Sequence, residues 1–150
     1  VKGIELEEND YVIGMEVCSE NLCLLAVTEN GFGKRSELDE YKVQSRGGKG
    51  ILTYRVTAKT GNLAGVKLVN DSDDIMLISS DGTIIRMNVS EISVLGRATQ
   101  GVTLMRMNEG DKVVCVARIV KEEESESENS NEDTENIEES PAEDNSHEEA

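Results

Sequence analysis

The chain has 150 residues and a formal net charge of −16, which is distributed unevenly. Residues 1–120 hold 14 basic and 17 acidic residues, a net charge of −3, whereas residues 121–150 hold one Lys and 14 acidic residues, a net charge of −13. No apolar run approaches the ~18 residues of a membrane span, and no signal peptide is recognisable. The only histidine, His147, lies in the acidic segment, which excludes histidine-based catalysis within residues 1–120.

Short runs rich in Val, Ile, Leu, Thr and Met recur along residues 1–120 and predict an all-β fold. Asn30-Gly31 and Asp81-Gly82 stand between two such pairs of runs, which is a strong hairpin signal. No segment keeps a helical period over ten residues, and only single turns are expected at 36–41 and 89–93. The predicted strands are 11–17, 22–28, 52–57, 63–69, 75–79, 83–87, 103–107 and 113–120.

The chain repeats itself at an offset of 51 residues. A glycine-basic box at residues 44–50 (the first box) returns in weaker form at residues 96–101 (the second box). Other landmarks keep the same offset: Thr28 and Ser79, Gly31 and Gly82, Arg35 and Arg86, Glu40 and Glu91. A period near 50 residues with about four strands per unit predicts propeller-like blades. Residues 1–4 read like the end of a further unit, and position 1 is not Met, so we expect a piece of a larger array.

The first box suits contact with phosphate groups. Its glycines let the backbone approach a phosphate closely, and two cations flank them within a locally basic stretch, residues 34–59. A nucleotide-binding P-loop is excluded, because Gly50 stands where Ser or Thr would hold magnesium and no long helix follows. The alternative is a loop whose glycines only turn a corner between blades. The first box contains Gln44, Ser45, Arg46, Gly47, Gly48, Lys49 and Gly50.

Residues 1–120 resemble the C-terminal DNA-wrapping domain of DNA gyrase A, which belongs to the bacterial type IIA topoisomerases. The hallmark box of that family reads Gln–basic–Arg–Gly–Gly–basic–Gly, and the first box matches it except at Ser45, as the degenerate later boxes do. The hairpin at 27–35 and its echo at 78–86 also match. The resemblance implies the last blades of a six-bladed β-pinwheel at 1–120, followed by a disordered acidic tail at 121–150. The corresponding C-terminal domain of topoisomerase IV, which shares that fold, is the alternative.

The resemblance implies a module that binds and wraps double-stranded DNA without sequence specificity and so supports ATP-dependent negative supercoiling. No catalytic residue and no cofactor are expected in this chain. ATP and magnesium would bind to DNA gyrase B within an A2B2 complex in the cytoplasm, and the cleaving tyrosine would lie in the N-terminal part of DNA gyrase A. The DNA-binding residues implied are Gln44, Arg46, Gly47, Gly48, Lys49, Gly50 and Arg97, with Lys34, Arg35 and Arg86 continuing a basic track along the outer rim.

Two other residue classes carry further expectations. Cys18, Cys23 and Cys115 are odd in number and lack metal-ligand spacing, so we expect reduced, mostly buried thiols. The three tyrosines are interpreted as strand and packing residues. A propeller that serves as a protein-interaction scaffold is the competing class of function, but the chain has one Phe and no Trp, the kind of residue that dominates such interfaces.

The acidic tail generates a hypothesis of its own. Its 14 carboxylates, tethered near the boxes at an effective concentration on the order of millimolar, would compete with DNA for the same cations. Removing residues 121–150 from the full-length protein should therefore tighten DNA binding, and the gain should shrink as salt screens the attraction. The measurement is the Kd for duplex DNA at two salt concentrations. Equal affinity at low salt would leave the tail only a solubilising role.

Overall fold

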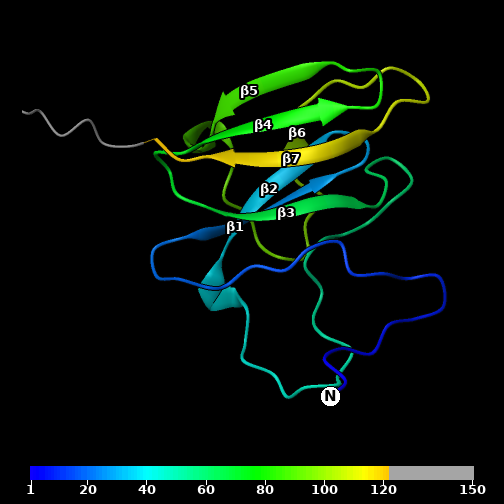
Figure 1. Cartoon of the computed structure of the whole chain (residues 1–150), viewed down its shortest axis with the longest axis vertical. Helices are drawn as coiled ribbons and strands as arrows, with labels where there is room; N and C mark the ends of the chain where they lie inside the picture. The colour runs from blue at the N-terminus through cyan, green and yellow to red at the C-terminus, as the bar shows by residue number, and fades with distance from the viewer. Residues whose placement is uncertain (122–150) are drawn as a thin grey trace, which may run out of the picture.

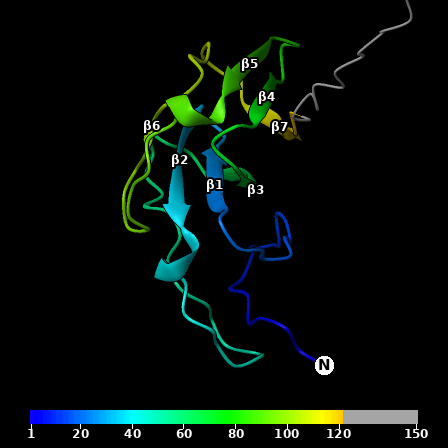
Figure 2. The same cartoon turned by 90° about the vertical axis from the view of Figure 1, so that its left-hand side faces the viewer.

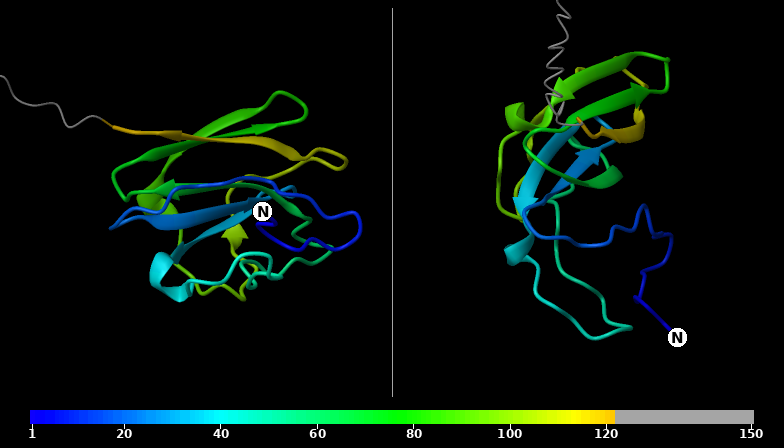
Figure 3. Two further views of the ribbon diagram at one scale, coloured as in Figure 1. Left: turned by 60° about the horizontal axis from the view of Figure 1, so that its bottom comes forward. Right: turned by 60° about the vertical axis from the view of Figure 1, so that its left-hand side comes forward.

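The structure, a computed structural model, describes residues 1–121, which form two antiparallel β-sheets. The first sheet has the strand order β3-β1-β2-β6 and the second the order β5-β4-β7. Figures 1 and 3 show the two sheets stacked on one another. Two 3₁₀ turns, η1 (Leu38–Glu40) and η2 (Val89–Glu91), follow β2 and β5. The strands are β1 (Cys23–Thr28), β2 (Phe32–Glu37), β3 (Leu63–Val69), β4 (Asp74–Ser79), β5 (Ile84–Asn88), β6 (Val102–Thr103) and β7 (Val113–Ile119).

The predicted repeat is present in three dimensions. The hairpin β1–β2 with its partner β3 recurs as the hairpin β4–β5 with its partner β7. Each unit has a register shift at the end of its first strand, at Thr28 and at Ser79. The hydroxyl of each of these residues also bonds across the hairpin turn, to the carbonyl of Phe32 at 3.3 Å and of Thr83 at 3.3 Å. The sequence landmarks therefore mark equivalent structural positions.

The two units are joined by a strand that crosses between them. β6, which directly follows the second box, pairs with β2 of the first unit through Phe32↔Thr103 and Gly33↔Val102. The first sheet thereby reaches the predicted four strands, the fourth coming from the second repeat. The described part of the second sheet has three strands, with β5 at its edge.

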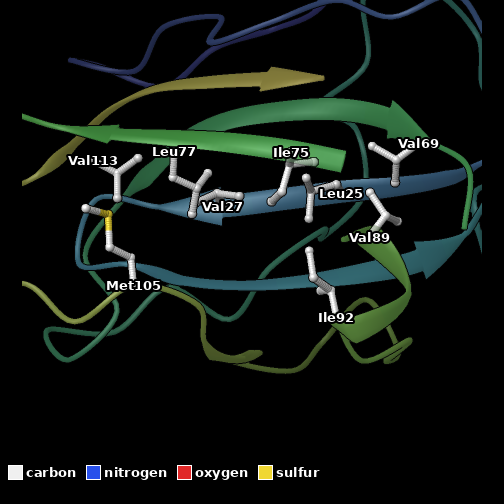
Figure 4. Close-up of a cluster of buried hydrophobic side chains, with 9 residues drawn as sticks. All are labelled: Leu25, Val27, Val69, Ile75, Leu77, Val89, Ile92, Met105 and Val113. Carbon is white, nitrogen blue, oxygen red and sulfur yellow. The ribbon is translucent and has the colours of Figure 1, made fainter. Parts of the chain in front are cut away.

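The core lies between the two sheets and is built from opposite faces of equivalent strands. Leu25 and Val27 of β1 point into it from one side, and Ile75 and Leu77 of β4 from the other (Figure 4). At the 51-residue offset Ile75 and Leu77 correspond to positions 24 and 26, not 25 and 27. Because successive strand residues alternate between faces, the front of one sheet packs on the back of the next. Val69, Val89, Ile92, Met105 and Val113 complete the core.

Two predicted strands are absent from the described residues: 11–17 and 52–57 lie in extended loops without ladder partners. The run at 103–107 is reduced to β6. By the repeat offset, residues 51–52 correspond to β6, but the described chain contains no earlier hairpin for them to pair with. Figure 2 shows these loops and the N-terminal segment extending below the sheets.

The expectation for the cysteines was also wrong in part: all three are free, but Cys18 and Cys115 are exposed and Cys23 is half-buried. The predicted tail lies outside the described residues, apart from Lys121.

The crossing strand generates a prediction about Gly101, which precedes it. Gly101 has φ +71°, and a Cβ there would lie 2.5 Å from both the Gly33 carbonyl oxygen and the Tyr54 hydroxyl. Gly110 has φ +84° with nothing within 4 Å of its Cβ position. Gly110→Ala should cost about 1–2 kcal/mol of unfolding free energy from backbone strain alone. Gly101→Ala should cost at least ~1 kcal/mol more, because the backbone must also move. Equal losses in chemical denaturation would contradict this packing.

Candidate nucleic-acid interface

The first box lies on the long loop after η1 and leans on the N-terminal segment. Gly47 and Gly50 adopt φ +76° and +81°, a backbone conformation that side chains disfavour. The Gly47 amide donates to the Gly3 carbonyl at 2.8 Å, and the Glu5 amide donates to the Gly48 carbonyl at 2.9 Å. The box is therefore held from one side by backbone contacts, which leaves its side chains free.

The side chains of the first box face solvent. Gln44, Arg46 and Lys49 are exposed, as are Gly48 and Gly50. Neither Arg46 nor Lys49 forms an ion pair with any residue between 1 and 121. Arg46 and Lys49 are thus two solvent-facing cations on one loop, a combination that suits contact with an anion such as phosphate.

The second box is packed more tightly than the first. The Arg97 guanidinium donates to the Leu52 carbonyl at 2.9 Å and lies 5.8 Å from the centre of the Tyr41 ring. The Arg97 amide donates to the Glu40 carboxylate at 3.1 Å. The Nε of Arg97 and the hydroxyl of Tyr41 are buried without a hydrogen-bond partner in the described part of the chain. Arg97 is thus half-buried and anchored, whereas Arg46 is exposed and pairs with no acidic side chain in the described range, 1–121.

Residues that follow the first box support the second. Tyr54 is buried and its hydroxyl donates to the Gln100 carbonyl, while the Arg55 amide donates to the Thr99 carbonyl at 3.1 Å. Burial raises the pKa of Tyr54 to about 12, so this hydroxyl keeps its proton. Packing roles for Tyr41 and Tyr54 agree with the sequence interpretation, whereas Tyr11 is exposed. The second box therefore rests on residues 52–55, which directly follow the first box.

The predicted basic track through Lys34, Arg35 and Arg86 is wrong. Lys34 is 0% exposed, and its ammonium donates to carbonyls of the second box. Arg35 is 6% exposed, donates to the Ile92 carbonyl at 2.8 Å and pairs with Asp71. The segment from Ile92 to β6 covers β2 and buries both cations.

Arg86, at the position equivalent to Arg35, keeps a half-exposed side chain because β5 is an edge strand with no such cover among the described residues. Its guanidinium pairs with Asp74 at 2.8 Å. Lys121 also lies 2.9 Å from this carboxylate. Hydrogen bonds from Lys121, Arg86 and Asn88 lower the pKa of Asp74 to about 2, so Asp74 stays charged and neutralises part of this patch.

The sequence interpretation did not foresee the contact of Glu40 with the second box. Its carboxylate accepts the hydrogen bond of the Arg97 amide. The repeated position of Glu40 and Glu91 was the sequence signal that could have indicated this contact.

Within residues 1–121 no group of three or more His, Cys, Asp or Glu side chains is placed to hold a metal ion. No helix in the same range is long and apolar enough to cross a membrane.

Comparison with known proteins agrees with this arrangement. The sequence model of the family described as "DNA gyrase C-terminal domain, beta-propeller" matches residues 1–19, 24–70 and 73–119. The DNA gyrase A protein of Staphylococcus epidermidis (strain ATCC 12228) is 44% identical over 128 residues, which cover 83% of this chain and 14% of that protein. The DNA gyrase A protein of Staphylococcus aureus (strain NCTC 8325) is 40% identical over 141 residues, 93% of this chain and 16% of that protein. The chain thus spans a small part of these relatives.

Solved structures show the same likeness. A DNA gyrase A C-terminal domain superposes with a TM-score of 0.75 at 28% identity, covering 80% of this chain and 41% of that one. The C-terminal domain of a DNA topoisomerase IV superposes with a TM-score of 0.72 at 25% identity, covering 79% of this chain and 37% of that one. From the family match over most of residues 1–119 and the repeated, box-bearing sheets, the chain belongs to the DNA gyrase C-terminal domain family of β-propellers.

Proposed function

We propose that this chain binds duplex DNA through its glycine-basic boxes and helps to wrap it, as part of a gyrase that introduces negative supercoils. The observation that carries the proposal is the first box, where Arg46 and Lys49 are exposed and free of ion pairs within residues 1–121, on a loop turned by Gly47 and Gly50. Such a loop contacts phosphate without reading bases, so binding is not sequence-specific.

The chained arrangement of the boxes supports wrapping over simple binding. The second box rests on residues 52–55, just after the first box, and the first rests on residues 3–5. Boxes linked in this way follow one another along one edge of the stacked sheets, in what we propose is a six-bladed β-pinwheel. DNA that contacts several of them must bend, at a cost on the order of several kcal/mol, which many phosphate contacts offset.

The remaining parts of the proposed activity lie outside this chain. By family, ATP and magnesium belong to DNA gyrase B, strand cleavage to the N-terminal part of DNA gyrase A, and the working unit is a cytoplasmic A2B2 complex. A role in topoisomerase IV is the alternative, since its C-terminal domain has nearly the same TM-score. The gyrase assignment is preferred because the relatives at 40–44% identity are gyrase proteins.

Reversing the charge of both exposed cations tests the proposed interface. Arg46→Glu with Lys49→Glu in the full-length protein should weaken DNA binding. The slope of log K against log salt, which is negative, should become less steep by about 2, since each phosphate contact contributes ~0.9 to its magnitude. The defect should be partial, because the second box keeps Arg97. Binding should be measured by titrating duplex DNA between about 50 and 200 mM salt.

A matched pair of lysines provides the control. Lys67→Glu with Lys112→Glu makes the same change in net charge at a half-exposed and an exposed lysine, which pair with Glu16 and Glu29 and belong to neither box. This control should leave the salt slope within about 0.5 of the unmodified protein. If both double variants lower the slope equally, the effect comes from total charge and the first box is not a contact site.

A further inference from the structure

Lys34 is the least expected feature of the described chain. It lies on β2 opposite Ala26, in the middle of a strand, and its side chain is completely buried. Burying an ammonium group is costly unless its protons are all accepted. A lysine kept in such a place must therefore be matched by groups that surround it.

All the acceptors around Lys34 within residues 1–121 belong to the second box. The ammonium donates to the Gly96 carbonyl at 2.7 Å and to the Arg97 carbonyl at 2.5 Å. Longer contacts reach the carbonyl and the hydroxyl of Thr99, at 3.3 and 3.2 Å. The ring of Tyr54 lies 4.8 Å from Nζ and closes the remaining side. Lys34 of one repeat thus binds the backbone of the next repeat's box.

These contacts fix which backbone groups of the loop face inward and which face outward. Three of its carbonyls turn inward to one buried cation, while on the exposed side the Arg97 amide already donates to a carboxylate, that of Glu40. The Arg97 amide shows that the outer side of this loop binds an anionic oxygen, as a backbone anion site does. The Arg97 side chain starts from the same held backbone.

We propose that Lys34 is a positioning residue for DNA binding, whose ammonium holds the second box with its carbonyls inward so that its outer side can accept a phosphate. This inference rests on the proposed function, since it gives Lys34 a role at the same interface. A lysine with a purely structural role on β2 would not need to bind the second box, so this role explains why Lys34 is buried against it.

The equivalent position in the second repeat supports a role tied to the box. At the 51-residue offset β5 carries Ile85, which packs against the core instead of binding a loop. No glycine-basic box covers β5 within residues 1–121. An aliphatic residue is therefore sufficient for the strand itself, and the lysine is present where there is a box to hold.

The charge of Lys34 also makes its contact with the second box depend on pH. Burial lowers the pKa of Lys34 to about 8, opposed by the nearby Glu40 carboxylate and assisted by the Arg97 guanidinium. Opening the loop would return Lys34 to water, where its usual pKa is 10.5, so between pH 8 and 10.5 the open loop binds a proton that the closed loop lacks. Loop opening should therefore become harder as the pH rises through this range, and global unfolding has the same sign for this group.

The test compares Lys34→Met with Lys67→Met, which removes one charge from a half-exposed lysine on β3. The amides of Arg97 and Arg55 report on the loop, because they donate to Glu40 and to the Thr99 carbonyl. Hydrogen exchange at these two amides in the full-length protein should be at least ~10-fold faster in Lys34→Met than in Lys67→Met, with β4 unchanged in both. The Kd for duplex DNA should rise several-fold more in Lys34→Met than in Lys67→Met.

Unchanged exchange at the Arg97 and Arg55 amides in a folded Lys34→Met protein would overturn the inference, whatever the DNA affinity. A loosened loop with unchanged Kd would overturn the link to DNA, whereas failure of the proposed function itself shows in the Arg46 and Lys49 variants. If Lys34→Met does not fold, the unmodified protein is compared at about pH 7 and 9.5 with exchange corrected for its intrinsic rate. Slower corrected exchange of the Arg97 and Arg55 amides at the higher pH supports the inference, because opening must then return Lys34 to water, and no change overturns it.

Discussion

The structure depends on the packing of the front of one sheet against the back of the next. Leu25 and Val27 of the first unit meet Ile75 and Leu77 of the second, and all four are fully buried. Each such side chain contributes roughly 1.5–3 kcal/mol by leaving water, a contribution that a single sheet with this face exposed to solvent would lose. Because equivalent strands use opposite faces, this packing can continue from unit to unit, and it sets the spacing at which successive boxes occur.

Local chemistry made the hairpins and the repeat predictable. Asn30-Gly31 and Asp81-Gly82 form turns whose residue preferences act over four residues, and the offset of 51 residues joined them into equivalent units. The runs at 11–17 and 52–57 have the same β-type composition but form no strands. A strand needs a partner for its backbone groups, and no local pattern shows whether that partner exists.

The candidate site also had one part that the sequence predicted and one part that it did not. The exposure of Arg46 and Lys49 followed from a glycine-rich loop, but equal spacing of Arg35 and Arg86 did not imply equal surroundings. Residues 92–103 cover β2 and bury Lys34 and Arg35, whereas β5 is uncovered within residues 1–121. Sequence offset identifies equivalent positions in a repeat, and only the neighbouring repeat decides which of those positions reach solvent.

The central claim is that the boxes of this chain guide DNA around the stacked sheets. The most direct measurement is the linking number of a closed circular plasmid that is relaxed by a type I topoisomerase while the full-length protein is bound. The proposed gyrase function implies that DNA is wrapped in a positive crossover. This predicts a positive shift in linking number that grows with the ratio of protein to DNA and is reduced by Arg46→Glu with Lys49→Glu. Binding without any shift in linking number would contradict the claim.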